Sequence, residues 1–131
     1  MRELSETGIK VNVTALFTTA QVELIVNAVK DGAPSYVSVF AGRIADAGID
    51  PVPLMRRAVD ILAAAPRAEL IWASPREVLN VVQADQVGCH IITMTSDLFA
   101  KLDLLGKDLA QFSLETVQMF HRDAQAAGFT L

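Results

Sequence analysis

The chain has 131 residues, about the length of one domain, and 52% of them are hydrophobic against 20% charged. This composition excludes a disordered tail and is typical of a well-packed soluble domain. A net charge of -4 argues against a nucleic-acid-binding protein, which needs a basic stripe for phosphates. No run of about 18 apolar residues is present, so no membrane span is expected. The charged residues 1–6 are unlike a secretory signal. A single cysteine, Cys89, is typical of the reducing cytoplasm, where we expect the protein.

Two strands, each followed by a helix, are predicted in the first half of the chain. Residues Ile9–Ala15 are rich in β-branched side chains and predict a strand, and helical spacing follows. Ser35–Phe40 predicts the second strand, with a helix from about Pro53. The apolar faces of the two helices are formed by Val22, Ile25, Val26 and Val29, and by Leu54, Ala58, Ile61, Leu62 and Ala65.

The third unit begins with a strand at Leu70–Ala73. Ser74 suits the N-cap of the next helix, Pro75 its first position and Glu77 its third, so a helix is predicted to begin there and to end at Gly88. Its expected buried face is formed by Val78, Val81 and Val82.

A fourth strand is predicted at His90–Thr93, followed by a helix from an N-cap at Ser96 through Leu105. A last helix is expected from Ser113 to Gly128, a suitable C′ glycine. Four strand–helix units predict an α/β fold with parallel strands. Such units form either an open doubly wound sheet, the default at this length, or part of an eight-stranded barrel. The residues at the strand ends favour the barrel.

Polar side chains gather at the predicted carboxyl ends of the strands, where α/β proteins place their sites. Two guanidinium groups beside hydroxyls, an amide and a helix N-terminus suit a small phosphorylated polyol. The candidates are Asn12 and Thr14 on one face of the first strand, Ser38 and Phe40 on one face of the second, Arg43 after it, and Ser74 and Arg76 after the third.

Each candidate also has a purely structural interpretation. Asn12 and Thr14 could be ordinary polar residues at a strand end, and Phe40 could belong to the core. A capping role for Ser74 needs no substrate. The two arginines could pair at the surface with Asp46 or Glu77.

The remaining chemistry-bearing residues predict no site. His90 and His121 have no acidic neighbours at a spacing typical of a metal site or a catalytic triad, and Cys89 is expected to be inert packing. The chain has no glycine-rich phosphate loop. We therefore expect neither a metal nor a cofactor.

The sequence resembles the transaldolase family, which includes the fructose-6-phosphate aldolases, along the whole chain. The blocks Gly88–Thr95 and Gly106–Phe129 are similar to a bacterial transaldolase-like subgroup. The other segments that carry the resemblance are Gly8–Phe17, Tyr36–Ile44, which is the most specific, and Trp72–Arg76.

The resemblance implies a class I aldolase, a TIM (βα)8 barrel that transfers or cleaves carbon–carbon bonds of pentose phosphate pathway sugars through a lysine Schiff base. It implies that Asn12 and Thr14 hold substrate hydroxyls and the catalytic water, and that Ser38 touches the dihydroxyacetone part. Phe40 would lie near the reacting carbon. By the same resemblance the phosphate ligands would be Arg43, Ser74 and Arg76.

The family's Schiff-base lysine lies on the fourth strand, and its supporting carboxylates lie on strands one and three. By the resemblance, residues 1–131 form a single half-barrel domain of strands five to eight, which suggests a truncated or split product. Lys10 shares the face of Asn12 and Thr14 but lies about 7 Å farther back along the strand and matches no catalytic position. We therefore expect the isolated chain to be inactive and limited to sugar-phosphate binding.

Half a barrel would leave strand edges and an inner face uncovered. We expect a homo-oligomer that closes the barrel or, failing that, a separately encoded N-terminal half that completes it. The alternative is a non-catalytic module that binds a sugar phosphate or serves only to oligomerise.

Overall fold

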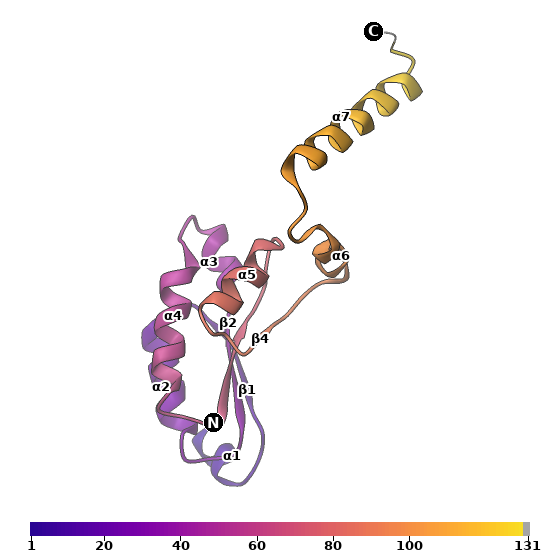
Figure 1. Cartoon of the computed structure of the whole chain (residues 1–131). Coiled ribbons are helices and arrows are strands. Elements are labelled where there is room, and N and C mark those ends of the chain that lie inside the picture. The colour runs from indigo at the N-terminus through magenta and orange to yellow at the C-terminus, as the bar shows by residue number, and fades with distance from the viewer. Residues whose placement is uncertain (130–131) are drawn as a thin grey trace. The chain divides into compact units, whose positions relative to one another are not determined.

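The computed structural model describes residues 1–129 (Figure 1). Its contacts divide the chain into two compact units, Met1–Ala100 and a second unit that begins at Lys101. That residues 1–131 act as one domain therefore stays a prediction. Within residues 1–129, no helix is both long enough and apolar enough to cross a bilayer.

The first unit consists of strands that alternate with helices. In chain order its elements are α1 (Arg2–Glu6), β1 (Asn12–Leu16), α2 (Thr19–Val29), β2 (Ser35–Val39), α3 (Ala41–Asp46), α4 (Pro51–Leu62), β3 (Ala68–Trp72), α5 (Leu79–Gln86), β4 (Ile91–Ile92) and α6 (Ser96–Ala100). The second unit contains a short 3-10 helix, Lys101–Leu104, and α7 (Leu109–Ala126).

The four strands form one parallel sheet in the order β1-β2-β3-β4, as the strand–helix repeats predict. Each new strand is added on the same side of the preceding one. A doubly wound sheet reverses direction at a switch point, whereas a barrel continues in one direction. The observed order is therefore consistent with part of a TIM-barrel aldolase.

Local sequence explains where the helices begin. Thr18 accepts a hydrogen bond from the Gln21 backbone, and the Gln21 side chain accepts one from the Thr18 backbone, which makes a capping box for α2. The Asp50 carboxylate accepts from the Val52 N–H, with Pro51 in the first turn of α4. These caps satisfy backbone donors that would otherwise lack partners at the helix starts.

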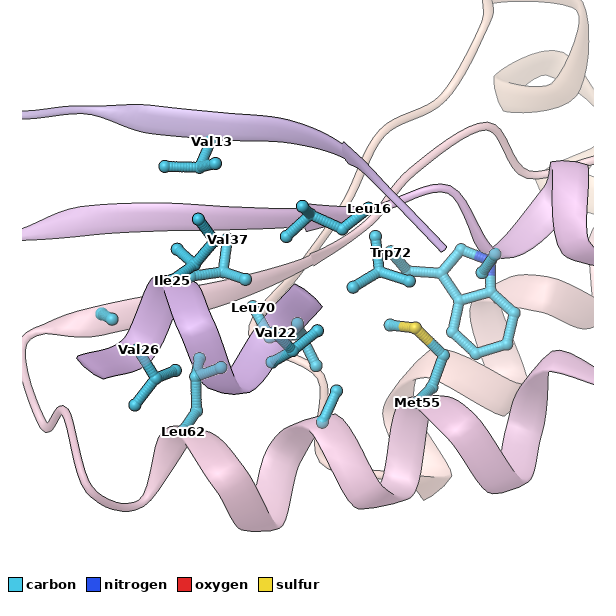
Figure 2. Packing of buried hydrophobic residues seen from close by; sticks show 14 of the residues in the cluster. Val13, Leu16, Val22, Ile25, Val26, Val37, Met55, Leu62, Leu70 and Trp72 are labelled. Atoms are coloured by element: carbon cyan, nitrogen blue, oxygen red, sulfur yellow. The ribbon is translucent and has the colours of Figure 1, made fainter. Parts of the chain in front are cut away.

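The core lies between one face of the sheet and helices α2 and α4, which lie side by side (Figure 1). Figure 2 shows Val37 and Leu70 from the strands directed toward Val22 and Met55 from the helices. All four are fully buried. Because successive residues of a strand alternate between faces, the residues between the buried ones point to the opposite face of the sheet.

The predicted start of the third helix at Ser74 is wrong, whereas its predicted end agrees with the structure, in which Gly88 follows the helix at φ 77°. The helix α5 begins at Leu79 after Val78, which makes no side-chain cap, and its buried residues include Asn80 rather than the three valines. The side-chain oxygen of Asn80 accepts hydrogen bonds from the backbone N–H groups of Arg76 and Glu77 and so holds the preceding loop against the start of the helix. The residues that favour a helix start therefore form an irregular loop.

Other boundaries shift for similar local reasons. The Thr95 hydroxyl, not Ser96, accepts a bond from the first turn of α6, and the regular α-helix there ends at Ala100. Helix α7 begins one turn earlier than Ser113, because Asp108 caps it at the Gln111 N–H. Gly128 follows its end at φ 82°, in the left-handed conformation expected of a C′ glycine.

Candidate phosphate site

Three of the four predicted substrate-contacting residues, Asn12, Thr14 and Ser38, lie on the face of the sheet that points away from the helices. Asn12 and Thr14 are exposed on either side of the buried Val13. The register pairs Asn12 with Tyr36, so Ser38, two residues further along β2, shares this face. Ser38 is nevertheless buried. We call this surface the open face.

Phe40 directly follows β2 and lies between an aromatic ring and a cation. Its ring centroid is 5.8 Å from that of Phe17 in an edge-to-face arrangement. The guanidinium carbon of Arg43 lies 5.2 Å from the same centroid. A cation at this distance is attracted by the face of an aromatic ring, so Phe40 helps to place Arg43 at the carboxyl end of β2.

The second predicted arginine, Arg76, lies in the loop after β3 and pairs with Asp46 on α3. Its Nε lies 2.9 and 3.0 Å from the two carboxylate oxygens, and its Nη2 also contacts Oδ2. Arg76 lowers the pKa of Asp46 through this bond, and the charge of Arg43 lowers it further. Asp46 therefore pairs with Arg76, and it lies one turn after Arg43 on α3. The surface pairing of Arg76 with Asp46, one of the two structural interpretations, is present.

Ser74 has a strained backbone, because its φ of 59° lies in the left-handed region that L-residues rarely adopt. The start of α3 holds it there. The Gly42 N–H donates to the Ala73 carbonyl oxygen at 3.3 Å, and a side chain at Gly42 would collide with the Ser74 backbone. Helix α3, which carries Arg43, and the loop after β3, which carries Ser74 and Arg76, are thus in direct backbone contact.

Lys10 lies on the open face but is not arranged as a nucleophile. Its Nζ donates a hydrogen bond to the Tyr36 hydroxyl at 2.9 Å and lies 4.6 Å from the centroid of that ring. The bond to Tyr36 raises the pKa of the Lys10 ammonium. An imine-forming lysine needs the opposite shift, since only the free amine attacks a carbonyl.

Cys89 and His90 have structural roles at the third strand. The Cys89 thiol donates weakly toward the carbonyl oxygens of Leu70 and Ile91, and burial raises its pKa. The Nδ1 of His90 accepts the Leu70 N–H at 3.1 Å. No group of three or more potential metal ligands occurs among residues 1–129.

A cavity of about 400 Å³ lies away from Arg43 and Arg76. It is lined by α1, the end of α2 and the loop that leads into β2, so it belongs to the amino-terminal edge of the strands. Arg2 and Lys30 contribute cations to it, and Glu6 and Asp31 contribute carboxylates. The predicted phosphate ligands are absent from its lining.

The sequence predicts the ligand candidates at the carboxyl ends of β2 and β3, but the local structure expected for the two arginines is wrong: Arg43 lies in α3 rather than in a loop, and Arg76 lies in a loop rather than in a helix. Two residues that organise these segments were also missed. Gly42 permits the backbone contact between α3 and the loop after β3, and the Asn80 side chain accepts a hydrogen bond from the Arg76 N–H. The sequence marks Gly42 only by its position, since it is a glycine that directly precedes the predicted ligand Arg43. No sequence pattern marks Asn80, because its partners belong to a loop that was predicted to be a helix.

The parallel α/β sheet, with a basic cluster at the carboxyl ends of its strands, has the architecture of part of an aldolase-type barrel. The family model for transaldolase/fructose-6-phosphate aldolase matches residues 1–131. The chain is 42% identical over 102 residues to a probable transaldolase of Streptococcus equi subsp. zooepidemicus (strain MGCS10565), which covers 76% of this chain and 45% of that protein. A probable transaldolase of Streptococcus pyogenes serotype M1 is 40% identical over the same length and with the same coverage.

The chain belongs to the transaldolase/fructose-6-phosphate aldolase family. It spans less than half the length of the curated relatives that it matches.

Proposed function

We propose that this transaldolase-like chain binds a sugar phosphate, with the phosphate held by Arg43, Ser74 and Arg76. The observation that carries the proposal is the position of the two arginines. They come from separate elements, α3 and the loop after β3, yet Asp46, one turn after Arg43 on α3, is hydrogen-bonded to Arg76. A phosphate has the same need for paired guanidinium donors as a carboxylate, and a larger charge.

The open face supplies groups for the rest of the sugar. Asn12 and Thr14 are exposed there and offer an amide and a hydroxyl to substrate hydroxyls. Ser38 and Phe40 lie one strand farther along, where they would contact the carbon chain of the sugar. These four roles come from the resemblance to the family and are supported by the shared face.

We further propose that this chain on its own does not form the Schiff base of class I aldolases. Lys10 is hydrogen-bonded through its ammonium to Tyr36, and Lys107 pairs with Glu115 on α7. Lys30 is at the C-cap of α2, and Lys101 begins the second unit. Borohydride reduction in the presence of fructose 6-phosphate is expected to leave all four lysines unlabelled. A labelled Lys10 would contradict this proposal.

Titration calorimetry with inorganic phosphate and with fructose 6-phosphate tests the binding proposal. The Arg43→Ala variant is expected to bind at least tenfold more weakly, since a hydrogen bond to a charged group contributes about 1.5–3 kcal/mol. Arg56→Ala removes an equally exposed arginine from α4 and serves as the control. If neither ligand binds the unmodified chain, the proposal fails and a purely oligomerising module becomes the better interpretation.

The assembly proposed for the chain is a second copy that completes the barrel, with strands β1–β4 as strands five to eight. Two features support it: the open face carries exposed strand residues, and β1 and β4 each pair on one side only. Unpaired strand edges and an uncovered inner face are costly in water. Light scattering at micromolar concentration is expected to give a dimer or larger. A monomer would leave a separate N-terminal half as the alternative partner.

A further inference from the structure

Arg76 already has an anionic partner within its own chain. The Asp46 carboxylate binds the edge of the guanidinium formed by Nε and Nη2, and both carboxylate oxygens accept from Nε. This edge is one of those that bind planar carboxylates and phosphates in bidentate fashion. Nearly half of each side chain is exposed to solvent, 46% for Arg76 and 51% for Asp46, so an incoming anion can reach the pair.

We propose that Asp46 is an internal counterion of the phosphate site, which a phosphate must displace from Arg76, and that this exchange lowers the affinity of the site. The inference rests on the proposed function and names the residue that sets its strength. It differs from a positioning role, in which Asp46 would stay bound and hold Arg76 in place for the ligand.

Charge and geometry favour the counterion role. Asp46 is the last residue of α3, one turn after Arg43 on the same helix, so its carboxylate stays close to the second guanidinium as well. Two arginines and one aspartate leave a net charge of about +1 for a phosphate dianion. An anion that takes the Nε/Nη2 edge must displace Asp46 from it, so the ordering that Asp46 gives to Arg76 is not carried into that complex.

The test is the affinity for inorganic phosphate, measured by calorimetry at low and moderate salt. Asp46→Asn keeps the shape of the side chain but removes its charge, and Asp46→Ala removes the partner altogether. Asp60→Asn removes the same charge from an exposed position on α4 and is the matched control. Circular dichroism establishes that each variant is folded.

Asp46→Asn is expected to bind phosphate more tightly than the unmodified chain, by about tenfold without salt and about threefold at moderate salt. These factors correspond to the repulsion between one negative charge and a dianion about 6 Å away in water, without and with screening by salt. The phosphate affinity of Asp46→Ala should change in the same direction. The affinities of both variants should depend more steeply on salt concentration than that of the unmodified chain. Weaker binding in both variants would show that Asp46 positions Arg76, and unchanged binding would show that the pair is incidental; either result overturns the inference.

The same titrations separate this inference from the proposed function. If the unmodified chain binds phosphate and Asp46→Asn binds no more tightly, only the counterion role fails. If only Asp46→Asn binds, the counterion role holds and phosphate binding by the unmodified chain is refuted. If neither binds, both fail.

Discussion

Replacing Gly42 with alanine would test whether the contact between α3 and the loop after β3 builds the phosphate site. A Cβ at this position would lie 1.5 Å from the Ser74 carbonyl oxygen and 2.6 Å from its carbon. Real Cβ atoms essentially never approach another heavy atom within 3.0 Å, and the obstacle here is backbone. The start of α3 and the loop must therefore separate by roughly 1.5 Å, which also breaks the bond from the Gly42 N–H to the Ala73 carbonyl oxygen.

The expected loss of unfolding free energy is about 2–4 kcal/mol, of which overpacking contributes about 1–3 and the hydrogen bond about 1. Urea denaturation followed by the fluorescence of Trp72, the only tryptophan, measures it. Phosphate affinity should fall at least tenfold in the folded variant, because Arg43 moves away from Ser74 and Arg76 and a charge-assisted bond of about 1.5–3 kcal/mol is lost.

Gly48→Ala is the matched control, since Gly48 has nothing within 4 Å of its added Cβ but a φ of 77°. It should cost about 1–2 kcal/mol from backbone strain alone and leave phosphate binding unchanged. If the Gly42→Ala variant has the stability and phosphate affinity of the unmodified chain, the contact between Gly42 and the Ser74 backbone does not position the phosphate ligands.

Three further predictions concern single residues. Ser74→Gly should relieve the backbone strain at φ 59° and raise the unfolding free energy measured by urea denaturation by about 0.5–1 kcal/mol. The same variant should bind phosphate about fivefold more weakly, because it lacks the hydroxyl donor. Weaker binding without a gain in stability would contradict the presence of strain at Ser74. Alkylation of Cys89 should be slower than that of a free thiol at neutral pH and should accelerate at pH values above the ordinary pKa of a thiol, because burial raises the pKa of Cys89. A rate equal to that of glutathione would contradict this prediction. Leu70→Ala should lower the unfolding free energy by about 2–5 kcal/mol because Leu70 is fully buried. Leu24 is exposed, so Leu24→Ala should change the unfolding free energy by no more than about 0.5 kcal/mol. Equal effects of the two substitutions in urea denaturation would contradict the position of Leu70 in the core.

The fold could be predicted where burial imposes a period on the sequence. The spacing of Val22, Ile25, Val26 and Val29 predicted α2 because that helix buries one side against the sheet. The short helix α3 was missed, since six residues are too few to show such a period. The loop at Ser74 is wrongly predicted because its conformation depends on contacts with Gly42 of α3 rather than on its own residues.

The candidate site was predictable in its location but not in its internal contacts. Parallel strands bring their carboxyl ends to one edge, so Arg43 and Arg76 were expected there before any geometry was known. Their partners were harder to assign. Asp46 and Glu77 were equal candidates for pairing with the arginines by sequence, and the packing of α3 beside the loop after β3 selects Asp46.

The most direct test is a phosphate titration of the chain followed by the chemical shifts of its backbone amides. Saturable changes are expected in two segments, around Arg43 and from Ser74 to Arg76, and Arg43→Ala should abolish them. Changes centred instead on the cavity beside Arg2 and Lys30, or no saturable change anywhere, would contradict a phosphate site formed by α3 and the loop after β3.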